Sequence, residues 1–480
     1  MDTLQVEVAV IGAGSAGLTA YRAAKSHGKR VVLIEGGPDG TTCARVGCMP
    51  SKLLIAAADA AHAAAGGAAF GVHATKLRID GRAVMARVRA ERDRFVGFVL
   101  DEVAHIPAAD RLHGRARFLD GQRLQVDQHT IVEAQQIVIA TGSSAAVPEL
   151  LQDAGDRLIV NDDVFEWQDL PASVAVVGSG IIGLELGQAL HRLGVRVTIF
   201  GRSERLAKLQ DPAVLAAASH YLGAELDLRL RTELVNVAWF GHEVQLLSRN
   251  ADGGEQSDRY DYLLSATGRT PNLQGLGLEH AGIALERHGV PLFDPHSMQC
   301  GSSRIFIAGD ASNENPVLHE AVDQGRIAGD NAGRYPALRP GLRRTPLTIA
   351  FCDPQVMTVG QTFWALEAAG PEAFAIGEVS FEDQGRSRVM LQNRGLLRVY
   401  GELGSGRFLG AEMIGPRAEH LAHLLAWACQ AGMTVSQMLD MPFYHPVIEE
   451  GLRTALRDLN EKLLQGLPEI AHCSDCTPGM

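Results

Sequence analysis

The chain has few cysteines and no excess of positive charge. Its 7 cysteines among 480 residues are an odd and sparse set, which argues against the disulfide framework of a secreted protein. Any paired cysteines are therefore expected to serve chemistry. The 56 acidic side chains outnumber the 44 basic ones and give a formal net charge of −12. A protein of this sign repels a phosphate backbone, so we expect no nucleic-acid partner.

A targeting sequence and a membrane-spanning segment are also missing. Residues 1–5 contain neither the basic nor the apolar region of a signal peptide, and a β-type run begins at Val6. The alanine-rich stretch 55–70 is interrupted by Asp59 and His62, which favours a helix of a soluble domain over a membrane span. We therefore expect a cytoplasmic protein with no membrane association.

The composition is that of a folded protein with several domains. Hydrophobic residues make up 46% of the chain and charged residues 21%, which is ordinary for globular proteins. A chain of 480 residues exceeds the size of one hydrophobic core. It is expected to divide into roughly three or four units.

A βαβ unit with a glycine-rich turn opens the chain. Its parts in order are a β-branched run at 6–11, the turn glycines Gly12, Gly14 and Gly17, a helix to about residue 27 and a strand at 30–34 that ends in Glu35. The glycines permit a tight turn and a close approach of the backbone to a pyrophosphate, to which the helix N-terminus presents N–H groups. Glu35 can accept hydrogen bonds from ribose hydroxyls, so the unit predicts a dinucleotide site.

A second unit of the same kind predicts a second dinucleotide. Its parts are a strand at 174–177, the turn residues Gly178, Gly180, Ile181, Ile182 and Gly183, a helix to about residue 193 and a strand at 195–200. Gly201 stands at the position of Glu35, so the acid that favours an unphosphorylated ribose is missing. The basic residues that follow are Arg202, Arg205 and Lys208. They favour a 2′-phosphate and hence NADPH, although the interleaved Glu204 and Asp211 leave an ordinary charged loop as the alternative.

Two cysteines follow the first unit, in the segment Cys43-Ala44-Arg45-Val46-Gly47-Cys48-Met49-Pro50-Ser51-Lys52. They can close a disulfide, and a helix start together with the cation of Lys52 would stabilise a thiolate when that disulfide opens. Metal binding is the alternative, but no second pair of ligands with metal-site spacing follows nearby. We expect a redox pair close to the first dinucleotide and no metal site.

Three further strand-like runs end in glycine or acidic turns. The runs 136–142 and 262–269 mark crossings between two nucleotide-binding domains. The run 305–310 places the carboxylate of Asp310 at a strand end, where it can bond a ribityl or ribose hydroxyl. Beyond a linker at 336–346, strand-like runs from 345 to 410 and helical runs from 418 to 465 predict a C-terminal α+β domain.

Together these motifs resemble the class I pyridine nucleotide–disulfide oxidoreductases, the family of dihydrolipoamide dehydrogenase and of glutathione, thioredoxin and mercuric reductases. The residues that carry the resemblance are Gly12, Gly14, Gly17, Glu35, Cys43 to Lys52, Gly178, Gly180, Gly183, Ala266 to Arg269, Gly309, Asp310, His445, Pro446 and Glu450. The resemblance implies an α/β fold with two Rossmann-like dinucleotide-binding domains, for FAD and NAD(P), and a C-terminal α+β dimerisation domain. The implied bounds are 1–145 and 265–340 for the FAD domain, 146–264 for the NAD(P) domain, 345–465 for the dimerisation domain and 466–480 for a flexible tail.

The activity that the resemblance implies is that of an FAD-dependent NAD(P)H:disulfide oxidoreductase similar to dihydrolipoamide dehydrogenase. A hydride would pass to FAD, and the flavin would reduce a Cys43–Cys48 disulfide. Cys48 would face the flavin, Cys43 would exchange with substrate, and Lys52 would pair with Glu185. The implied FAD-binding residues are Gly12, Gly14, Gly17, Glu35, Thr42, Lys52, Ala116, Thr141, Gly142, Asp310 and His319. The implied NAD(P)-binding residues are Gly178, Gly180, Ile181, Ile182, Gly183, Arg202, Lys208 and Gly268.

A histidine near the C-terminus completes the implied site. His445 is followed by proline and, five residues on, by Glu450, and a histidine oriented by a carboxylate can move protons to and from thiols near neutral pH. The family's dyad has this spacing and works across a homodimer with a shared active site. Mercuric reductases, as the resemblance is drawn, lack the histidine, so a small or protein-bound disulfide or dithiol is preferred over a metal ion.

Some cysteines and loop residues depart from the family pattern. Ser51 fits the dihydrolipoamide dehydrogenase branch, but Arg45 stands where asparagine is usual and Thr41 where glycine is usual. The cysteines that stand alone are expected to be inert packed thiols; they are Cys300, Cys352 and Cys429.

The tail carries a second cysteine pair, Cys473 and Cys476, with His472 beside it. The pair is similar to the C-terminal pairs of thioredoxin and mercuric reductases, and it would pass electrons to a protein disulfide or a metal ion. An incidental tail is the alternative, since termini tolerate change. For the whole chain, a non-catalytic flavin redox sensor is the alternative to an enzyme.

Overall fold

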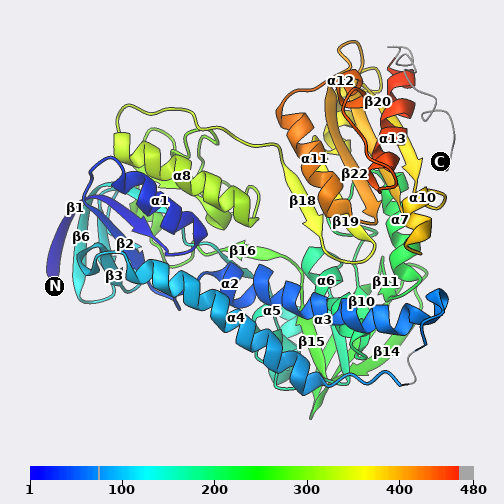
Figure 1. Ribbon diagram of the computed structural model, residues 1–480. Helices are drawn as coiled ribbons and strands as arrows, with labels where there is room; N and C mark the ends of the chain where they lie inside the picture. The colour runs from blue at the N-terminus through cyan, green and yellow to red at the C-terminus, as the bar shows by residue number, and fades with distance from the viewer. Residues whose placement is uncertain (74–75, 464–480) are drawn as a thin grey trace. The chain divides into compact units, whose positions relative to one another are not determined.

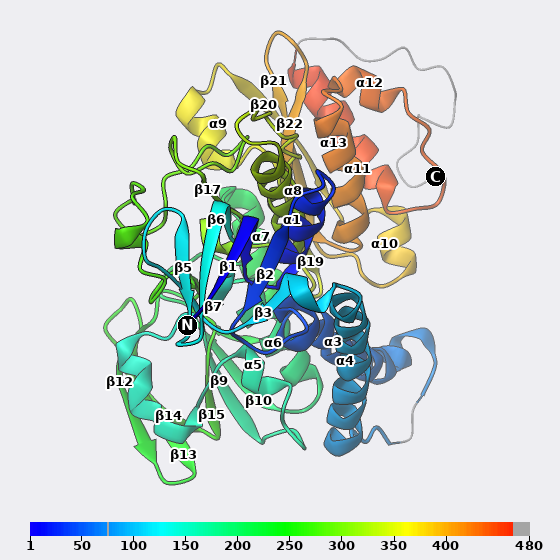
Figure 2. The ribbon, with the colours of Figure 1, turned by 90° about the vertical axis from the view of Figure 1, so that its left-hand side faces the viewer.

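The computed structural model describes residues 1–73 and 76–463 (Figure 1, Figure 2). The predicted tail 466–480, with Cys473 and Cys476, lies outside the described residues. The chain folds into two compact units. Unit 1 comprises Met1–Leu53, Ala86–Ala146 and Gly268–Arg343, and unit 2 comprises Leu54–Met85, Val147–Thr267 and the chain from Arg344 onward.

A seven-stranded sheet forms the centre of unit 1, with the order β3-β2-β1-β6-β5-β4 and with β17 beside β6. The parallel strands are β1 Asp2–Ile11, β2 Val31–Glu35, β3 Arg111–His113, β6 Thr130–Ile139 and β17 Ile305–Ile307, and the antiparallel ones are β4 Ala116–Phe118 and β5 Arg123–Val126. Val8 and Val10 of β1 point into one core, and Ala9 and Ile11 into another. The end of the strand, residues 8–11, is therefore buried on both faces, which explains its uninterrupted apolar run.

Two helices cross closely on one face of this sheet (Figure 1). They are α1 Ser15–Lys25 and α8 Leu318–Arg334. A Cβ at Gly325 or Gly329 of α8 would overlap the backbone carbonyl oxygen of Ala16 or Ala20 of α1. Glycine at the crossing therefore fixes the first turn of α1 in place.

The remaining elements that begin or lie in unit 1 are α2 Thr42–Val46, α3 Cys48–Gly66, β7 Ser143–Ala145 and β16 Arg269–Pro271, and α4 Gly81–Ala104 runs into it.

A parallel sheet with the order β11-β10-β9-β15-β8 forms the first part of unit 2. Its strands are β8 Leu158–Ile159, β9 Ser173–Val177, β10 Arg196–Phe200, β11 Asp227–Arg229 and β15 Tyr262–Ser265, and its helices are α5 Asn161–Val164, α6 Ile181–Arg192 and α7 Pro212–Gly223. An antiparallel sheet accompanies it, formed by β12 Glu233–Phe240, β13 Glu243–Arg249 and β14 Glu255–Tyr260. Helix α7 begins at Pro212 because Asp211 accepts hydrogen bonds from the N–H groups of Ala213 and Val214.

The C-terminal part of unit 2 is an antiparallel sheet with the order β18-β19-β22-β21-β20, packed against helices. The strands are β18 Leu347–Ala350, β19 Gln355–Gly360, β20 Phe374–Ser380, β21 Leu396–Glu402 and β22 Phe408–Gly415, and the helices are α11 Ala418–Gln430, α12 Val435–Leu439 and α13 Glu449–Lys462. Leu421 and Leu425 of α11 and Leu456 of α13 are completely buried in the shared core. The predicted α+β arrangement is confirmed, whereas the predicted domain bounds within unit 2 stay a prediction.

Two short helices correct the prediction of strands alone between 345 and 410. They are α9 Phe363–Ala369 and α10 Gly385–Val389. The Thr362 side chain accepts a hydrogen bond from Ala365 N, and the Gln384 side chain accepts one from Ser387 N, so both helices begin at N-capping residues. Helices of one or two turns carry too few apolar residues to show a period in the sequence.

One helical stretch bears on the predicted absence of a membrane span, which stays a prediction. Thr42–Phe70 is long and apolar enough to cross a membrane by length and composition, and a window of it has mean hydropathy 1.4 and is 22% buried. Asp59 and His62 do not prevent this, because the surrounding alanines keep the mean hydropathy high. In the structure Asp59 pairs with Arg192 of α6 at 3.3 Å. The polar group of the stretch is thus bound by the protein itself.

Candidate functional site

The first glycine turn contacts neighbouring backbone at Gly12 and Gly17 and is open at Gly14. Gly12 has φ +104°, and a Cβ there would overlap the carbonyl oxygen of Ala140, while a Cβ at Gly17 would overlap the carbonyl oxygen of Gly12. At Gly14, in contrast, no described atom beyond its chain neighbours lies within 4 Å of where a Cβ would stand. The N-terminus of α1 has no side-chain cap and faces this open space. A phosphate-binding turn has this form.

Glu35 lies beside the turn, at the end of β2. Its Oε2 accepts a hydrogen bond from Ala13 N at 2.6 Å, and its Oε1 accepts one from Gly37 N at 2.7 Å. These two backbone donors orient the carboxylate and hold it at the end of the strand. The structure thus brings together the turn and the acid that the sequence predicts for a ribose.

Polar groups of unit 1 without a protein partner provide a test of whether FAD fits here. The Oγ1 of Thr141 is buried and accepts or donates no hydrogen bond among the described residues. A buried unpaired hydroxyl costs free energy, so it is expected to bond a ligand. Thr141 borders Gly12, and Gly309, next to Asp310, borders Ala16 in the first turn of α1. These residues fit a dinucleotide that lies along the turn.

The other predicted FAD-binding residues also belong to unit 1. Thr42 is the first residue of α2 and His319 is the second residue of α8, and both side chains are exposed. Gly142 follows Thr141 with φ +70°. Ala116 is buried in β4.

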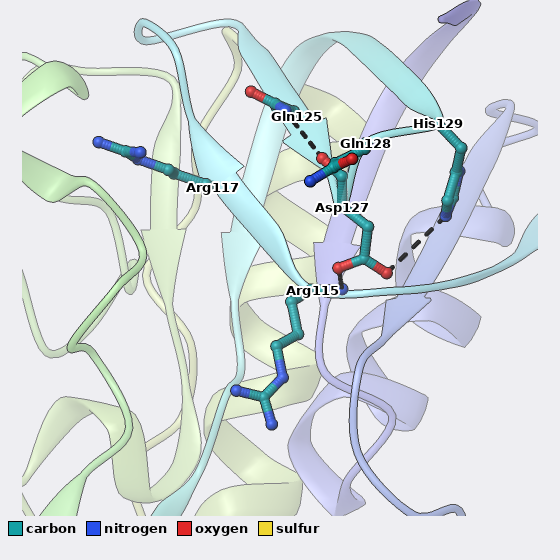
Figure 3. A pocket seen from close by; sticks show the side chains of 6 residues that line it. All are labelled: Arg115, Arg117, Gln125, Asp127, Gln128 and His129. Carbon is teal, nitrogen blue, oxygen red and sulfur yellow. Dashed lines mark hydrogen bonds and ion pairs between the residues drawn. The ribbon is translucent and has the colours of Figure 1, made fainter.

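An open cavity of about 710 Å³ lies around this last strand, and Figure 3 shows the side chains along it. It is lined by Arg115, Arg117, Gln125, Asp127, Gln128 and His129. Arg115 and Arg117 flank Ala116, and the side chain of Arg115 lies against Gly36, directly after Glu35. Asp127 lies 3.9 Å from His129, and the two arginines add positive charge to the same rim. Sequence analysis did not identify the cavity, and its lining contains none of the predicted catalytic residues.

The two cysteines of unit 1 lie on consecutive short helices. Cys43 is in α2, whose N-terminus is capped by the Thr41 side chain, and Cys48 is the first residue of α3. Neither cysteine is in a disulfide, and Cys48 is exposed whereas Cys43 is partly buried. A hydrogen bond with Cys48 and burial raise the pKa of the Cys43 thiol well above its usual range, against an opposing effect of Lys52. Cys43 therefore keeps its proton when the reduced pair loses a first one.

Both departures from the family pattern in this loop affect its geometry. Thr41 has φ +58°, in the left-handed region where glycine is favoured. The side chain of Arg45 packs against Gly40, and its Nε is buried with no hydrogen-bond partner among the described residues. Ser51 is buried and donates a hydrogen bond to Cys48 O at 3.1 Å.

Lys52 and Glu185 belong to different units, so their pairing stays a prediction. Glu185 lies on α6, is 4% exposed, and accepts a hydrogen bond from Phe351 N at 2.9 Å. Burial, with a contribution from Glu185, raises the pKa of Cys352 to about 12. Burial alone raises the pKa of Cys300 to about 12. Both thiols stay protonated at neutral pH, as expected of inert packed cysteines.

The second glycine turn repeats the geometry of the first. Gly178 has φ +121°, a Cβ there would overlap the carbonyl oxygen of Ala266, and a Cβ at Gly183 would overlap that of Gly178. Gly180 is open in the same way as Gly14, and it precedes Ile181 and Ile182, the first residues of α6. Gly268, the other residue predicted for this nucleotide, lies in unit 1.

The basic loop after β10 is attached to this second turn. The Ser179 hydroxyl donates to Arg205 O at 2.6 Å, and Ala207 N donates to Ser179 O at 2.9 Å. The side chains of Arg202, Arg205 and Lys208 are exposed, and the guanidinium of Arg205 lies 4.7 Å from the ring centroid of Trp364.

The acidic side chains of the same loop bind other parts of unit 2. Glu204 pairs with Arg231 at 3.3 Å, and Asp211 is completely buried, where it caps α7.

His445 and Glu450 form a preassembled pair in unit 2. The Nδ1 of His445 lies 2.9 Å from Oε1 of Glu450, and Oε2 of Glu450 accepts a hydrogen bond from Val447 N at 3.0 Å. The Gln384 side chain donates to Val447 O at 2.7 Å and so supports this turn. Sequence analysis missed Gln384, because it is distant in the chain and has no motif. The imidazole is exposed.

Comparison with known families covers most of the chain. The family model "Pyridine nucleotide-disulphide oxidoreductase" matches residues 6–325, and the model "Pyridine nucleotide-disulphide oxidoreductase, dimerisation domain" matches residues 347–456. The chain therefore carries the dimerisation domain of this family in the part of unit 2 that was predicted to hold it.

Relatives of two activities are similar to the chain. Mercuric reductase of Streptomyces lividans is 33% identical, with 92% of this chain and 93% of that protein covered. Mercuric reductase of Shigella flexneri is 32% identical, with 96% and 82% covered. Dihydrolipoyl dehydrogenase 3 of Pseudomonas aeruginosa is 29% identical, with 96% and 99% covered.

Two solved structures share the fold. The HOCl-induced flavoprotein disulfide reductase RclA from Escherichia coli has a TM-score of 0.79 at 23% identity, with 95% of this chain and 99% of that chain covered. LpdA from Mycobacterium tuberculosis has a TM-score of 0.80 at 24% identity, with 94% and 99% covered. The chain belongs to the pyridine nucleotide-disulphide oxidoreductase family of flavoproteins, which bind FAD and use NAD(P)H.

Proposed function

We propose that the protein is an NAD(P)H-dependent reductase of a low-molecular-weight disulfide, similar to dihydrolipoyl dehydrogenase. The observation that carries this proposal is the His445–Glu450 pair at 2.9 Å. Such a pair takes and returns protons, which a disulfide substrate requires and a metal ion does not. The family and its cofactors are common to both groups of relatives, so the choice of substrate rests on this proton chemistry.

The residues proposed to hold FAD are the first glycine turn, Glu35, Thr141 and Asp310, and those for NAD(P)H are the second glycine turn and Gly268. When bound, FAD would supply the hydride-accepting chemistry that links NAD(P)H to reduction of the Cys43–Cys48 disulfide. Lys52 supplies a positive charge next to the cysteine pair, and its charge favours the thiolate form.

Cys43 is the proposed nucleophile for substrate. Because the pKa of its thiol is raised, it needs a base, and His445 of the second subunit is the proposed one. Cys43 transfers its proton to His445 and attacks one sulfur of the substrate disulfide. The other sulfur leaves as a thiolate and takes the proton back from the imidazolium, which Glu450 stabilises. The Cys48 thiolate then attacks the Cys43 sulfur, so the Cys43–Cys48 disulfide forms again and the second substrate sulfur leaves as a thiolate, which takes its proton from solvent.

NADPH is the proposed electron donor. Arg202 and Lys208 are exposed on a loop held to the second glycine turn. The acids of the loop, Glu204 and Asp211, are bound to other partners. The loop therefore presents the basic side chains of Arg202 and Lys208 next to a nucleotide-binding turn, which favours a ribose 2′-phosphate.

A second candidate function is reduction of a metal ion or a protein disulfide through Cys473 and Cys476. The similarity to mercuric reductases favours it. Among residues 1–73 and 76–463 no cluster of three or more His, Cys, Asp or Glu side chains could hold a metal ion. This activity would therefore depend on the tail pair, on the cysteines of unit 1, or on both.

Replacing Cys48 with alanine is expected to lower the pKa of the Cys43 thiol, because it removes the hydrogen bond that favours the protonated form. Alkylation of Cys43 by iodoacetamide in the reduced protein should then reach its half-maximal rate at a lower pH than in the wild type. Mass spectrometry of the labelled peptide measures this, with buried Cys300 as the internal control. An unchanged pH profile would contradict the assigned cause of the raised pKa.

Replacing His445 with alanine is expected to lower lipoamide turnover on the order of 10²-fold, the usual contribution of general acid–base catalysis. Glu450→Gln should lower it less, since the imidazole remains. Steady-state kinetics measure both, and stopped-flow reduction of the flavin by NADPH should stay unchanged. The exposed His242 provides the control variant. Normal turnover in His445→Ala would remove the histidine from the mechanism.

Replacing Arg202 or Lys208 with alanine is expected to weaken NADPH binding about 10-fold, the cost of a lost charge-assisted hydrogen bond. The KM for NADH should change less than twofold. Binding of 2′,5′-ADP compared with 5′-AMP isolates the contribution of the 2′-phosphate, and Arg249→Ala is the control for a surface charge. If the wild type binds both nucleotides equally, NADPH preference is wrong.

Replacing Cys473 and Cys476 with serine together is expected to leave lipoamide turnover unchanged, because the small disulfide reaches Cys43 directly. Reduction of Hg(II) and of a protein disulfide should be measured in the same preparation. A loss of lipoamide turnover, or a much greater wild-type rate with Hg(II) that disappears in the variant, would favour the second candidate function.

A further inference from the structure

A continuous chain of hydrogen bonds joins Arg269, Ser143 and Asp310. Arg269 is the first residue of β16, the strand that follows the return of the chain from unit 2 to unit 1. The Arg269 Nε donates to the Ser143 hydroxyl at 2.7 Å, and the Ser143 hydroxyl donates to Asp310 Oδ2 at 2.6 Å. A second donor of Arg269, Nη2, bonds Ser143 O at 2.6 Å. The guanidinium also lies 3.8 Å from Asp310 Oδ2.

The directions of these bonds are fixed by chemistry. Arg269 has only donors, so the Ser143 oxygen accepts from it, and the single hydroxyl proton of Ser143 points to Asp310. This bond occupies Oδ2. The second oxygen of Asp310, Oδ1, accepts no hydrogen bond among the described residues. It is the atom that is available to a ligand hydroxyl.

The strands that hold Arg269 and Ser143 are the two at which the chain crosses between the units. Strand β7 precedes the departure after Ala146, and β16 follows the return at Gly268. The two strands pair antiparallel, with Pro271 opposite Ser143. The hydrogen-bond chain therefore starts from two paired strands, each of which lies next to a point where the chain crosses between the units.

The backbone of Asp310 is held independently of this chain. Gly309 N donates to Gln324 Oε1 at 2.8 Å, and the Ser312 hydroxyl donates to the same oxygen at 3.1 Å. Gln324 is 1% exposed. The turn at 309–312 is thus fixed from α8, so the Ser143 hydroxyl affects the orientation of the carboxylate rather than the path of the chain.

We propose that Arg269 and Ser143 form a positioning relay that orients Asp310 toward a ribityl hydroxyl of FAD. Ser143 is the positioning residue and Arg269 fixes Ser143. The inference rests on the proposed role of Asp310 in holding FAD. It assigns a role in cofactor retention to the two crossing strands, which neither the sequence motif nor the family membership assigns.

The test is the rate of FAD release from the full-length holoenzyme after dilution, measured by the fluorescence of free flavin. Ser143→Ala is expected to release FAD on the order of 10-fold faster, since a hydrogen bond to a charged group is lost. Ser143→Thr, which keeps the hydroxyl, should restore slow release. Ser144→Ala is the control, because this neighbouring hydroxyl bonds Asn272 at 2.8 Å and not Asp310. Arg269→Lys should not restore the wild-type rate, since an ammonium cannot reproduce the paired contacts of the guanidinium.

A double variant separates positioning from a general loss of structure. In an Asp310→Ala background, Ser143→Ala is expected to change FAD release less than twofold, because the relay has lost its target. Equal acceleration in both backgrounds would overturn the relay, as would normal release from Ser143→Ala when Asp310→Ala releases FAD quickly. Normal release from Asp310→Ala would instead overturn the proposed role of Asp310.

Discussion

The close contact between a glycine and a neighbouring strand end determines the architecture of both nucleotide sites. At Gly12 a side chain would overlap Ala140, and at Gly178 it would overlap Ala266. Because the glycine turn lies directly against the sheet, the helix that follows begins at the sheet edge where parallel strands end. The N-terminus of this helix has no side-chain cap. Strand-end residues gather at such an edge in α/β sheets. In unit 1 this constraint brings Glu35, Thr141 and the turn before Asp310 to one place, and each depends on the turn having no side chain.

The proposed mechanism links the protonation of the cysteine pair to the histidine. Burial and the hydrogen bond with Cys48 keep a proton on Cys43, so a nucleophile at this position has to be activated by a base. The His445–Glu450 pair provides one that is already oriented, because Val447 N holds the second carboxylate oxygen. The carboxylate contacts the imidazole through Nδ1, which leaves Nε2 for the proton of a thiol. In the proposed mechanism a thiol with a raised pKa needs a base to take its proton, so Cys43 and the oriented histidine are required together.

Sequence predicted the features that depend on local pattern and missed those that depend on distant contacts. The sequence predicts both glycine turns, their strands and helices, and the His445–Glu450 spacing, because each of these features lies within a short segment. The helices α9 and α10 are too short to show a period. Ser143 and Gln384 act through residues that are remote in the chain, and neither has a distinctive neighbour.

The proposed choice of substrate rests on the proton chemistry of the site. A metal ion needs thiolates as ligands and takes up electrons without a proton, so it has no use for an oriented imidazole. A disulfide becomes two thiols and needs a proton for each sulfur that leaves. In this chain the imidazole is held by Glu450, Glu450 by Val447, and Val447 by Gln384, all within unit 2. Three residues from two chain segments thus hold one proton carrier in position. Such an arrangement is consistent with a proton-dependent half-reaction at Cys43, and similarity to mercuric reductases at 32–33% identity carries less weight than this geometry.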